Sequence, residues 1–265
     1  MSYREEVIGG QRLILGDCLE VMTSLAPVPL IATDIPYNLG IAMGTGNDRV
    51  PDYDNFVQQW LDLCVQTLSP TGSLWFATSE DYIGKHVMWV DERFQNRRCV
   101  IWSRATPNYA CKKSLSNMYE PLMYGAVSST YTFNLQDVMV PANYAGAKTT
   151  IHSKKRAGLT ISDTKNPTDL WKIESAFHSR VEYVGFKGQK PVALYERIVL
   201  LSSNPTDTVL DPFMGSGTTL VACENTGRSG IGIETNVDHF DIACRRVEAV
   251  VKQREAEQAQ LSLTV

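Results

Sequence analysis

Two short segments of this chain combine residue types whose chemistry is informative before any fold is considered. Residues 33–38 (TDIPYN) bring together a carboxylate, a proline and a tyrosine, a set suited to holding an amino group flat against an aromatic ring. Residues 211–219 (DPFMGSGTT) place two glycines where a strand would turn into a helix, which suits a nucleoside. A nucleoside site combined with an amine site indicates transfer of a group from a cofactor to an exocyclic nitrogen.

The second segment is expected to bind its ligand through the glycine turn. Asp211 follows an expected strand at 207–210, and Gly215 and Gly217 precede a helical pattern. Glycine lets the backbone approach a ligand closely, and the exposed N–H groups at the start of a helix favour polar or anionic partners. Glu234 ends the next expected strand, 23 positions after Asp211, and an acidic residue at that point usually binds ribose hydroxyls.

Two common nucleotide-binding patterns are absent from this turn. The dinucleotide pattern GxGxxG is not formed because the residues TTL follow Gly217, and the phosphate-binding pattern GK[ST] is not formed because no lysine follows it. A ligand with a ribose but without a phosphate requirement remains. Asp211 would suit a cationic ligand, so S-adenosylmethionine, with its ribose, ammonium and sulfonium groups, fits this combination best.

The first segment is expected to activate a weak nucleophile at the carboxyl end of a strand, where α/β sheets bind ligands. The amino nitrogen of adenine or cytosine is a poor nucleophile because its lone pair is delocalised into the ring. The Asp34 carboxylate and the Ile35 carbonyl can each accept one of its N–H bonds and favour a more pyramidal nitrogen. Tyr37 can stack on the base, a contact worth about 1–3 kcal/mol, and Pro36 stiffens the turn.

Together the two segments resemble the amino-methyltransferases of DNA, which methylate adenine N6 or cytosine N4. The hallmarks of that family are Asp-Pro-Pro-Tyr or Ser-Pro-Pro-Tyr and a Phe-x-Gly-x-Gly cofactor loop. Residues 213–217 (FMGSG) match the loop, and residues 34–37 (DIPY) match the tetrad, with Ile35 in place of its first proline. Because the tetrad precedes the loop, the resemblance is to the β-ordered group, in which the cofactor half follows the catalytic half.

Further blocks extend the resemblance over most of the chain. Residues 15–18 (LGDC) resemble an early acidic element that would contact the adenine of the cofactor, and residues 102–120 resemble a loop that closes over a flipped base. Residues 169–171 (DLW) and 189–191 (QKP) resemble blocks near the methionine end of the cofactor. Residues 185–188 (GFKG) are a departure, since many relatives carry His-Pro-Thr there.

The residues and the resemblance together define three sets of candidate site residues. The catalytic set is Asp34, Ile35, Pro36 and Tyr37. The cofactor-binding set is Asp17, Cys18, Asp34, Lys190, Asp211, Pro212, Phe213, Gly215, Ser216, Gly217, Thr218, Glu234 and Thr235. The set expected to contact the base and DNA is Tyr37, Asn38, Tyr109, Lys112, Lys113, Lys154, Lys155 and Arg156. No metal site is expected, because the six cysteines form no CxxC pair and the four histidines supply no companion ligand.

The composition is that of an ordinary globular chain. With 265 residues, of which 43% are hydrophobic and 20% charged, it is long enough for one domain with an insertion. The longest apolar runs fall far short of a membrane span, and residues 1–11 show no signal peptide, so an intracellular location is expected.

Basic residues gather in two segments, although the net charge of −4 argues against indiscriminate coating of nucleic acid. Residues 93–113 hold six basic residues and no acidic one, and residues 148–190 hold nine basic residues against four acidic ones. Such clusters can form a phosphate-facing surface, and solvated surface charge is the alternative. Double-stranded DNA is the expected partner, and the second segment contains Lys154, Lys155 and Arg156, the candidates for target recognition.

The order of apolar runs and helical spacing predicts an α/β fold. The resemblance implies a single Rossmann-like, S-adenosylmethionine-dependent methyltransferase domain with a mostly parallel seven-stranded sheet. A target-recognition insertion at about 128–188, where the alternation fails, would separate a catalytic half (12–127) from a cofactor half (189–257). The expected strands are 28–33, 73–77, 99–102, 121–124, 207–210 and 230–233, and the expected helices are 55–67, 192–202, 218–226 and 237–257.

The function that follows is methyl transfer from S-adenosylmethionine to adenine N6 in duplex DNA by base flipping. Asp34, rather than serine, favours adenine, and N4-cytosine methylation is the main alternative. A methyltransferase for protein, RNA or small molecules would normally carry Asn-Pro-Pro-Tyr after the cofactor loop, and the intact motifs count against an inactive DNA-binding module. Relatives of this kind often pair, so a homodimer is one expected assembly.

Overall fold

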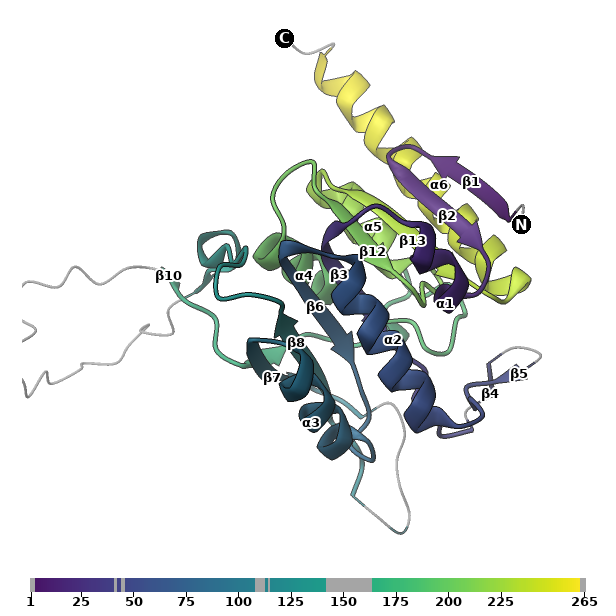
Figure 1. Cartoon of the computed structure of the whole chain (residues 1–265). Helices are drawn as coiled ribbons and strands as arrows, with labels where there is room; N and C mark the ends of the chain where they lie inside the picture. The colour runs from purple at the N-terminus through teal and green to yellow at the C-terminus, as the bar shows by residue number, and fades with distance from the viewer. Residues whose placement is uncertain are drawn as a thin grey trace, which may run out of the picture.

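A mixed sheet forms the centre of the molecule (Figure 1). The computed structural model describes residues 3–40, 42–43, 46–107, 113, 115–141 and 164–262. Within these residues the main sheet has nine strands in the order β1-β2-β13-β12-β3-β6-β8-β7-β11. In that order their bounds are Arg4–Ile8, Gln11–Leu15, Ser229–Glu234, Thr208–Asp211, Val28–Asp34, Leu68–Ala77, Tyr119–Ala126, Asn96–Ser103 and Leu170–Lys172.

The strands at the centre of the sheet are parallel. β2, β13, β12, β3 and β6 pair in parallel one after another, whereas β8 runs antiparallel to both of its neighbours, β6 and β7. β11 pairs in parallel with β7, and β1 forms an antiparallel hairpin with β2 at the other edge. The predicted α/β class with a mostly parallel sheet is confirmed.

Helices cover both faces of the sheet (Figure 1). Alternation along β3 separates the two layers, since successive side chains of a strand point to opposite faces. Ile31 packs in one buried cluster with Trp60 of α2, and Leu30 packs in another with Ile198 of α4. The first layer contains α1 (Cys18–Val21), α2 (Tyr53–Thr67) and α3 (Ile83–Arg93), and the second contains α4 (Val192–Ser202), α5 (Thr218–Thr226) and α6 (Val237–Ser262).

Short elements complete the described chain. Two small antiparallel pairs lie outside the main sheet, namely β4 (Ala42–Met43) with β5 (Gly46–Asn47) and β9 (Val140–Pro141) with β10 (Thr164–Lys165). The 3-10 turns are η1 (Met22–Ser24), η2 (Leu135–Val138) and η4 (Ala176–His178). No helix in the described ranges has the length and apolar character needed to cross a membrane.

Several elements differ from the expectation based on sequence. The sheet has nine described strands rather than the expected seven. Two strands were not predicted because they lack an apolar run: β1 is exposed and charged, and β11, inside the expected insertion, has three residues. The strand expected at 73–77 begins earlier, at Leu68, and residues 69–72 belong to β6 with an irregularity in its pairing with β3. The helix α3 is also new, since only His86 and Val90 are buried on it, and α6 continues past residue 257 to Ser262.

Gly232 of β13 offers a test of the packing around the glycine turn. A methyl group built on Gly232 would clash with the Met214 sulfur and lie 2.9 Å from Leu220 Cδ1. We expect Gly232→Ala to lower the free energy of unfolding by about 1–3 kcal/mol, because the neighbours must shift.

The matched control is Gly84→Ala in α3, where no atom lies within 4 Å of the added methyl group. Alanine should there raise the free energy of unfolding by about 0.5–1 kcal/mol, because it is the better helix former. Urea unfolding followed by circular dichroism measures both changes. A Gly232→Ala protein as stable as the wild type would contradict the packing.

Candidate active site

The carboxyl ends of the parallel strands open into a cavity of about 800 Å³. β3 ends at Asp34, β12 at Asp211 and β13 at Glu234, and these three strands are neighbours in the sheet. All three residues line the cavity, at the edge where α/β sheets bind ligands. The two segments singled out in the sequence therefore share one space, although most of the chain separates them.

The turn between β12 and α5 requires glycine. Gly215 and Gly217 have φ values of 50° and 77°, in the left-handed region that side chains rarely adopt. The Gly215 N–H donates to Glu234 Oε2 at 3.0 Å, which ties the turn to the end of β13. A methyl group on Gly215 would lie 3.0 Å from the ring of Phe186, so the segment that departs from the His-Pro-Thr of relatives packs directly on the turn.

The predicted cofactor-binding residues all line the cavity except Gly217. Gly217 lies behind the wall, where an added methyl group would be 3.2 Å from Ala243 of α6. Arg246 of α6 donates from Nη1 to Ser216 Oγ at 3.1 Å and to Thr218 Oγ1 at 2.8 Å. The turn is thereby fixed by α6, independently of any ligand.

Two carboxylates line the cavity where β13 ends and α1 begins. Glu234 Oε1 accepts the Asn236 N–H at 2.8 Å; burial raises the pKa of Glu234, and this N–H opposes the shift. Asp17 precedes α1 and accepts the Leu19 N–H at 2.7 Å. Each carboxylate oxygen has two lone pairs, so both side chains retain capacity for the hydroxyl and amino groups of a nucleoside. The residues present therefore fit a ribose-bearing cofactor.

The Asp211 carboxylate is bound by donors from the chain itself. Oδ1 accepts the Thr33 hydroxyl at 2.5 Å and the Phe213 N–H at 3.1 Å, and Oδ2 accepts the Thr219 hydroxyl at 2.5 Å. Burial raises the pKa of Asp211 to about 6, against the effect of the two threonine hydroxyls. Asp211 thus joins the turn to β3, and its role as a countercharge for a cationic ligand stays a prediction.

The predicted catalytic turn is held by two tyrosines that the sequence does not single out. Tyr53 of α2 donates its hydroxyl to the Pro36 carbonyl at 2.7 Å, and Asn38 Nδ2 donates to the Tyr82 hydroxyl at 3.0 Å. Asn38 has a φ of 58°, and its Oδ1 accepts the Val50 N–H at 3.0 Å. Asn38 therefore stabilises the turn, and its predicted contact with DNA stays a prediction.

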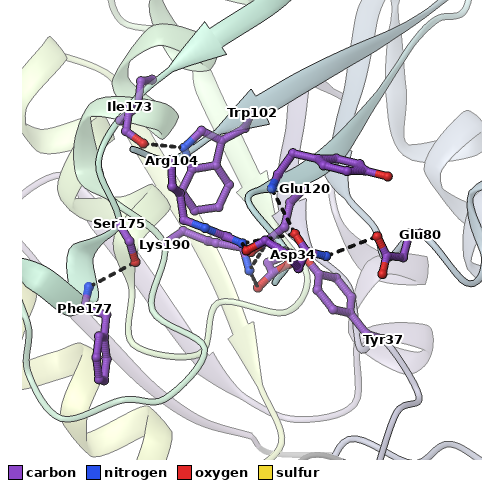
Figure 2. Close-up of polar contacts among 12 residues, drawn as sticks. Asp34, Tyr37, Glu80, Trp102, Arg104, Glu120, Ile173, Ser175, Phe177 and Lys190 are labelled. Atoms are coloured by element: carbon purple, nitrogen blue, oxygen red, sulfur yellow. Dashed lines mark hydrogen bonds and ion pairs between the residues drawn. The ribbon is translucent and has the colours of Figure 1, made fainter. Parts of the chain in front are cut away.

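Five charged and polar side chains meet beside this turn (Figure 2), and we call them the Asp34 cluster. Lys190 Nζ lies 2.9 Å from Asp34 Oδ2 and 2.9 Å from Glu120 Oε2. Glu120 also accepts the Tyr37 hydroxyl at 2.9 Å and pairs with Arg104 Nη1 at 2.5 Å. Lys190, predicted to bind the cofactor, is thus placed between two carboxylates.

Opposing effects set the pKa values within the Asp34 cluster. Burial raises the pKa of Asp34, with Lys190 lowering it and Glu120 raising it further. Burial also works to raise the pKa of Glu120, but Lys190 and Arg104 outweigh it and hold that pKa below its ordinary value. Burial would lower the pKa of Lys190, and its two carboxylate partners raise it instead. Lys190 therefore stays charged at any physiological pH.

Arg104 and Glu120 emerge as site residues only from the pairing of β7 with β8. The antiparallel register places Trp102 opposite Glu120, which brings Arg104, just beyond the end of β7, beside the carboxylate. In the sequence, Arg104 belongs to a basic segment and Glu120 to the loop that resembles a base-closing element. Their spacing along the chain carries no signal for an ion pair.

The remaining predicted residues have mixed positions. Cys18 lines the cavity, and burial raises the pKa of its thiol to about 12, so it acts as an apolar wall. Lys113 is exposed. Tyr119 and Phe177, which the sequence does not single out, line the cavity with 40% and 42% of their surface exposed. The other predicted base and DNA contacts lie outside the described residues: Tyr109, Lys112, Lys154, Lys155 and Arg156.

Comparison with known proteins places this site in a family. Residues 28–245 match the family model of the N6/N4 methyltransferases, described as DNA methylase. The type II methyltransferase M.HpaI of Haemophilus parainfluenzae is 32% identical over 248 residues, which cover 90% of this chain and 74% of that protein. The DNA adenine methyltransferase YhdJ of Escherichia coli (strain K12) is 30% identical over 251 residues, covering 89% and 82%.

Solved structures share the fold. The structure of an M1.HpyAVI–SAM complex superposes with a TM-score of 0.65 at 23% identity, covering 89% of this chain and 98% of that one. The cytosine-N4-specific PvuII DNA methyltransferase superposes with a TM-score of 0.69 at 14% identity, covering 93% of each chain. With the family match, the resemblance is confirmed: the chain belongs to the N6/N4 family of DNA methyltransferases.

The raised pKa of Asp211 predicts a specific dependence of stability on pH. A carboxyl whose pKa rises from 3.8 to about 6 on folding stabilises the fold fully below about pH 4 and loses that contribution as the pH rises through 6. In Asp211→Asn this dependence should disappear, so between pH 4 and 6 the wild type should lose roughly 2–3 kcal/mol relative to the variant.

Urea unfolding at several pH values measures the difference. Asp137→Asn, at an exposed position of η2, is the control and should leave the wild-type pH dependence unchanged. If wild type and Asp211→Asn keep a constant difference from pH 4 to 7, the buried carboxyl does not titrate in this range.

Proposed function

We propose that this DNA methyltransferase transfers the methyl group of S-adenosylmethionine to N6 of an adenine flipped out of duplex DNA. One observation carries the proposal: Asp34 shares the cavity with the glycine turn, and its Oδ1 is buried without a hydrogen-bond partner in the described chain. A buried acceptor without a donor is costly, and an exocyclic amino group supplies such a donor.

In the proposed reaction, two acceptors on one turn activate the amino group. Asp34 Oδ1 accepts one N6–H bond and the Ile35 carbonyl accepts the other, which localises the lone pair on nitrogen. The Tyr37 ring stacks on the base, with its hydroxyl fixed by Glu120. The bond from N6 to the methyl carbon forms as the carbon–sulfur bond breaks, sulfur keeps the electron pair, and the extra proton leaves nitrogen through Asp34. Positioning and electrostatics provide the acceleration.

The donor would occupy the half of the cavity formed by β12 and β13. S-adenosylmethionine supplies an electrophilic methyl group, and the SAM complex of M1.HpyAVI supports this choice of donor. Glu234 would accept hydrogen bonds from the ribose hydroxyls, and Asp17 would accept one from the amino group of the donor's adenine, beside the turn at Gly215 and Ser216. A cavity of about 800 Å³ is near the upper end of the range of roughly 300–1,000 Å³ for ligand sites, which suits a donor and a base together.

The identity of one residue favours adenine over cytosine. Asp34 stands where the cytosine-type tetrad carries serine, and the adenine specificity named for YhdJ is consistent with this. The fold is compatible with both bases, because the PvuII enzyme is cytosine-N4-specific. N4-cytosine methylation is therefore the second candidate.

We assign recognition of the target sequence to residues 128–188. The described part of this segment reaches the site, since β11 pairs with β7, and Ser175 and Phe177 line the cavity. Phosphate contacts are assigned to Lys113 and to the basic run at 154–156. Assembly as a homodimer stays an expectation drawn from the resemblance.

Mass spectrometry of nucleosides tests the proposed reaction and its base. Genomic DNA from a methylation-deficient host contains every short target sequence, so no recognition site needs to be known in advance. After incubation with the protein and S-adenosylmethionine, N6-methyladenine should appear and N4-methylcytosine should not. Formation of N4-methylcytosine alone would overturn the assignment of the base.

Replacing Asp34 tests its proposed role. Asp34→Ala should lower kcat/KM for methylation by roughly 10²–10³-fold, because the amino group loses its principal acceptor. The affinity for S-adenosylmethionine, measured by calorimetry, should be almost unchanged, since Asp34 accepts the substrate amine. Glu255→Gln, at an exposed position of α6 away from the cavity, is the control and should retain full activity. Wild-type turnover by Asp34→Ala would refute the role.

A further inference from the structure

The two oxygens of the Asp34 carboxylate have different environments. Oδ2 is held by Lys190 Nζ at 2.9 Å, whereas Oδ1 is buried and has no partner in the described part of the chain. The Lys190 carbonyl accepts the Thr218 hydroxyl at 3.2 Å, at the start of α5. The residue that holds Asp34 is thus itself bonded to the helix that begins at the glycine turn.

Lys190 also balances the charge of a second carboxylate. Its Nζ lies 2.9 Å from Glu120 Oε2, and Arg104 forms an ion pair with the other oxygen of Glu120, Oε1. Two cations and two carboxylates therefore form a neutral group of buried or half-buried side chains. Such a group tolerates burial only while each charge keeps its partner.

We propose that Lys190 is a positioning residue for Asp34: it fixes Oδ2 so that Oδ1 faces the substrate amine, and it offsets the charge of Glu120 so that Asp34 stays ionised. This inference rests on the proposed role of Asp34 and deepens it. It differs from the role in cofactor binding that the sequence resemblance implies for Lys190.

The other groups that face Asp34 make the contribution of Lys190 decisive. The other titratable groups that face Asp34 come from β8, α2, α4, the end of β12 and the turn that holds Asp34 itself. Lys190 is the only cation among the described residues that contacts Asp34. Without that ammonium, the negative charge of Glu120 would oppose ionisation of Asp34 with no cation of the described residues in contact with Asp34, so protonation of Asp34 would be favoured. The facing groups are Glu120, Tyr53, Tyr195, Asp211 and Tyr37.

Carbon-13 NMR of aspartate carboxyl groups tests the inference on the full chain without DNA or donor. The Asp34 resonance is assigned by its absence in Asp34→Asn. Lys190→Met should raise the pKa of Asp34 by about 1–3 units, the usual effect of losing an adjacent opposite charge. Glu120→Gln should lower it, the double variant should lie between the two, and Lys190→Arg, which keeps the charge, should leave it close to the wild type.

The same variants are then assayed for methylation across pH. In Lys190→Met, the pKa that defines the acidic limb of the pH profile of kcat/KM should rise by the same amount as the Asp34 pKa measured by NMR. Raising the pH should then restore part of the activity. A role in binding the donor would instead weaken donor affinity without moving the limb. An Asp34 pKa that is unchanged in Lys190→Met overturns the inference.

Two further outcomes are decisive. If Lys190→Met does not fold, Glu120→Gln decides, because an unshifted Asp34 titration there also overturns the inference. If the NMR shifts appear as expected while Asp34→Ala retains wild-type turnover, the proposed catalytic role of Asp34 fails, and the electrostatic coupling of Lys190 to Asp34 stands as a structural property alone.

Discussion

The hydrogen bond from the Thr33 hydroxyl to the Asp211 carboxylate joins the two strands on which the whole site depends. β3 and β12 are adjacent and parallel, so their carboxyl ends lie at one edge of the sheet. Thr33 precedes Asp34, the residue proposed to bind the substrate amine, and Asp211 opens the glycine turn. This contact and the pairing of the two strands together set the spacing between Asp34 and the part of the chain that is proposed to hold the methyl donor.

Electrostatic balance is the second requirement of this arrangement. The cavity wall carries the buried carboxylate of Asp211, the partly buried carboxylates of Glu120 and Glu234, and the ammonium of Lys190. Each described carboxylate is stabilised in its own way, Asp211 by threonine hydroxyls, Glu234 by backbone N–H groups and Glu120 by two cations. Among the carboxylates of the described residues, only Asp34 has a buried oxygen without a hydrogen-bond partner. This oxygen is the acceptor that is proposed to bind the substrate amine.

Much of the site could be predicted because it lies at strand ends. Asp34, Asp211 and Glu234 each end a short, largely apolar strand, and the rule that parallel strands end at one edge brings them together. The need for glycine at positions 215 and 217 follows from their positive φ values. The family match confirms the resemblance drawn from these residues.

The Asp34 cluster could not be predicted, because its ion pairs depend on long-range register. Arg104 meets Glu120 only through the antiparallel pairing of β7 with β8, and Lys190 reaches both carboxylates from the segment before α4. The strands β1 and β11 were equally hidden, since one is charged and exposed and the other has three residues. The spacing of apolar residues along the sequence indicates which face of a helix or strand is buried. It carries no information about which side chains contact each other across the sheet.

A crystal structure with S-adenosylmethionine bound would test the central claim most directly. The account predicts the ribose hydroxyls on the Glu234 carboxylate and the sulfonium methyl group directed into the space in front of Asp34 Oδ1. A donor bound with its ribose away from Glu234, or with its methyl group shielded from Asp34, would contradict it.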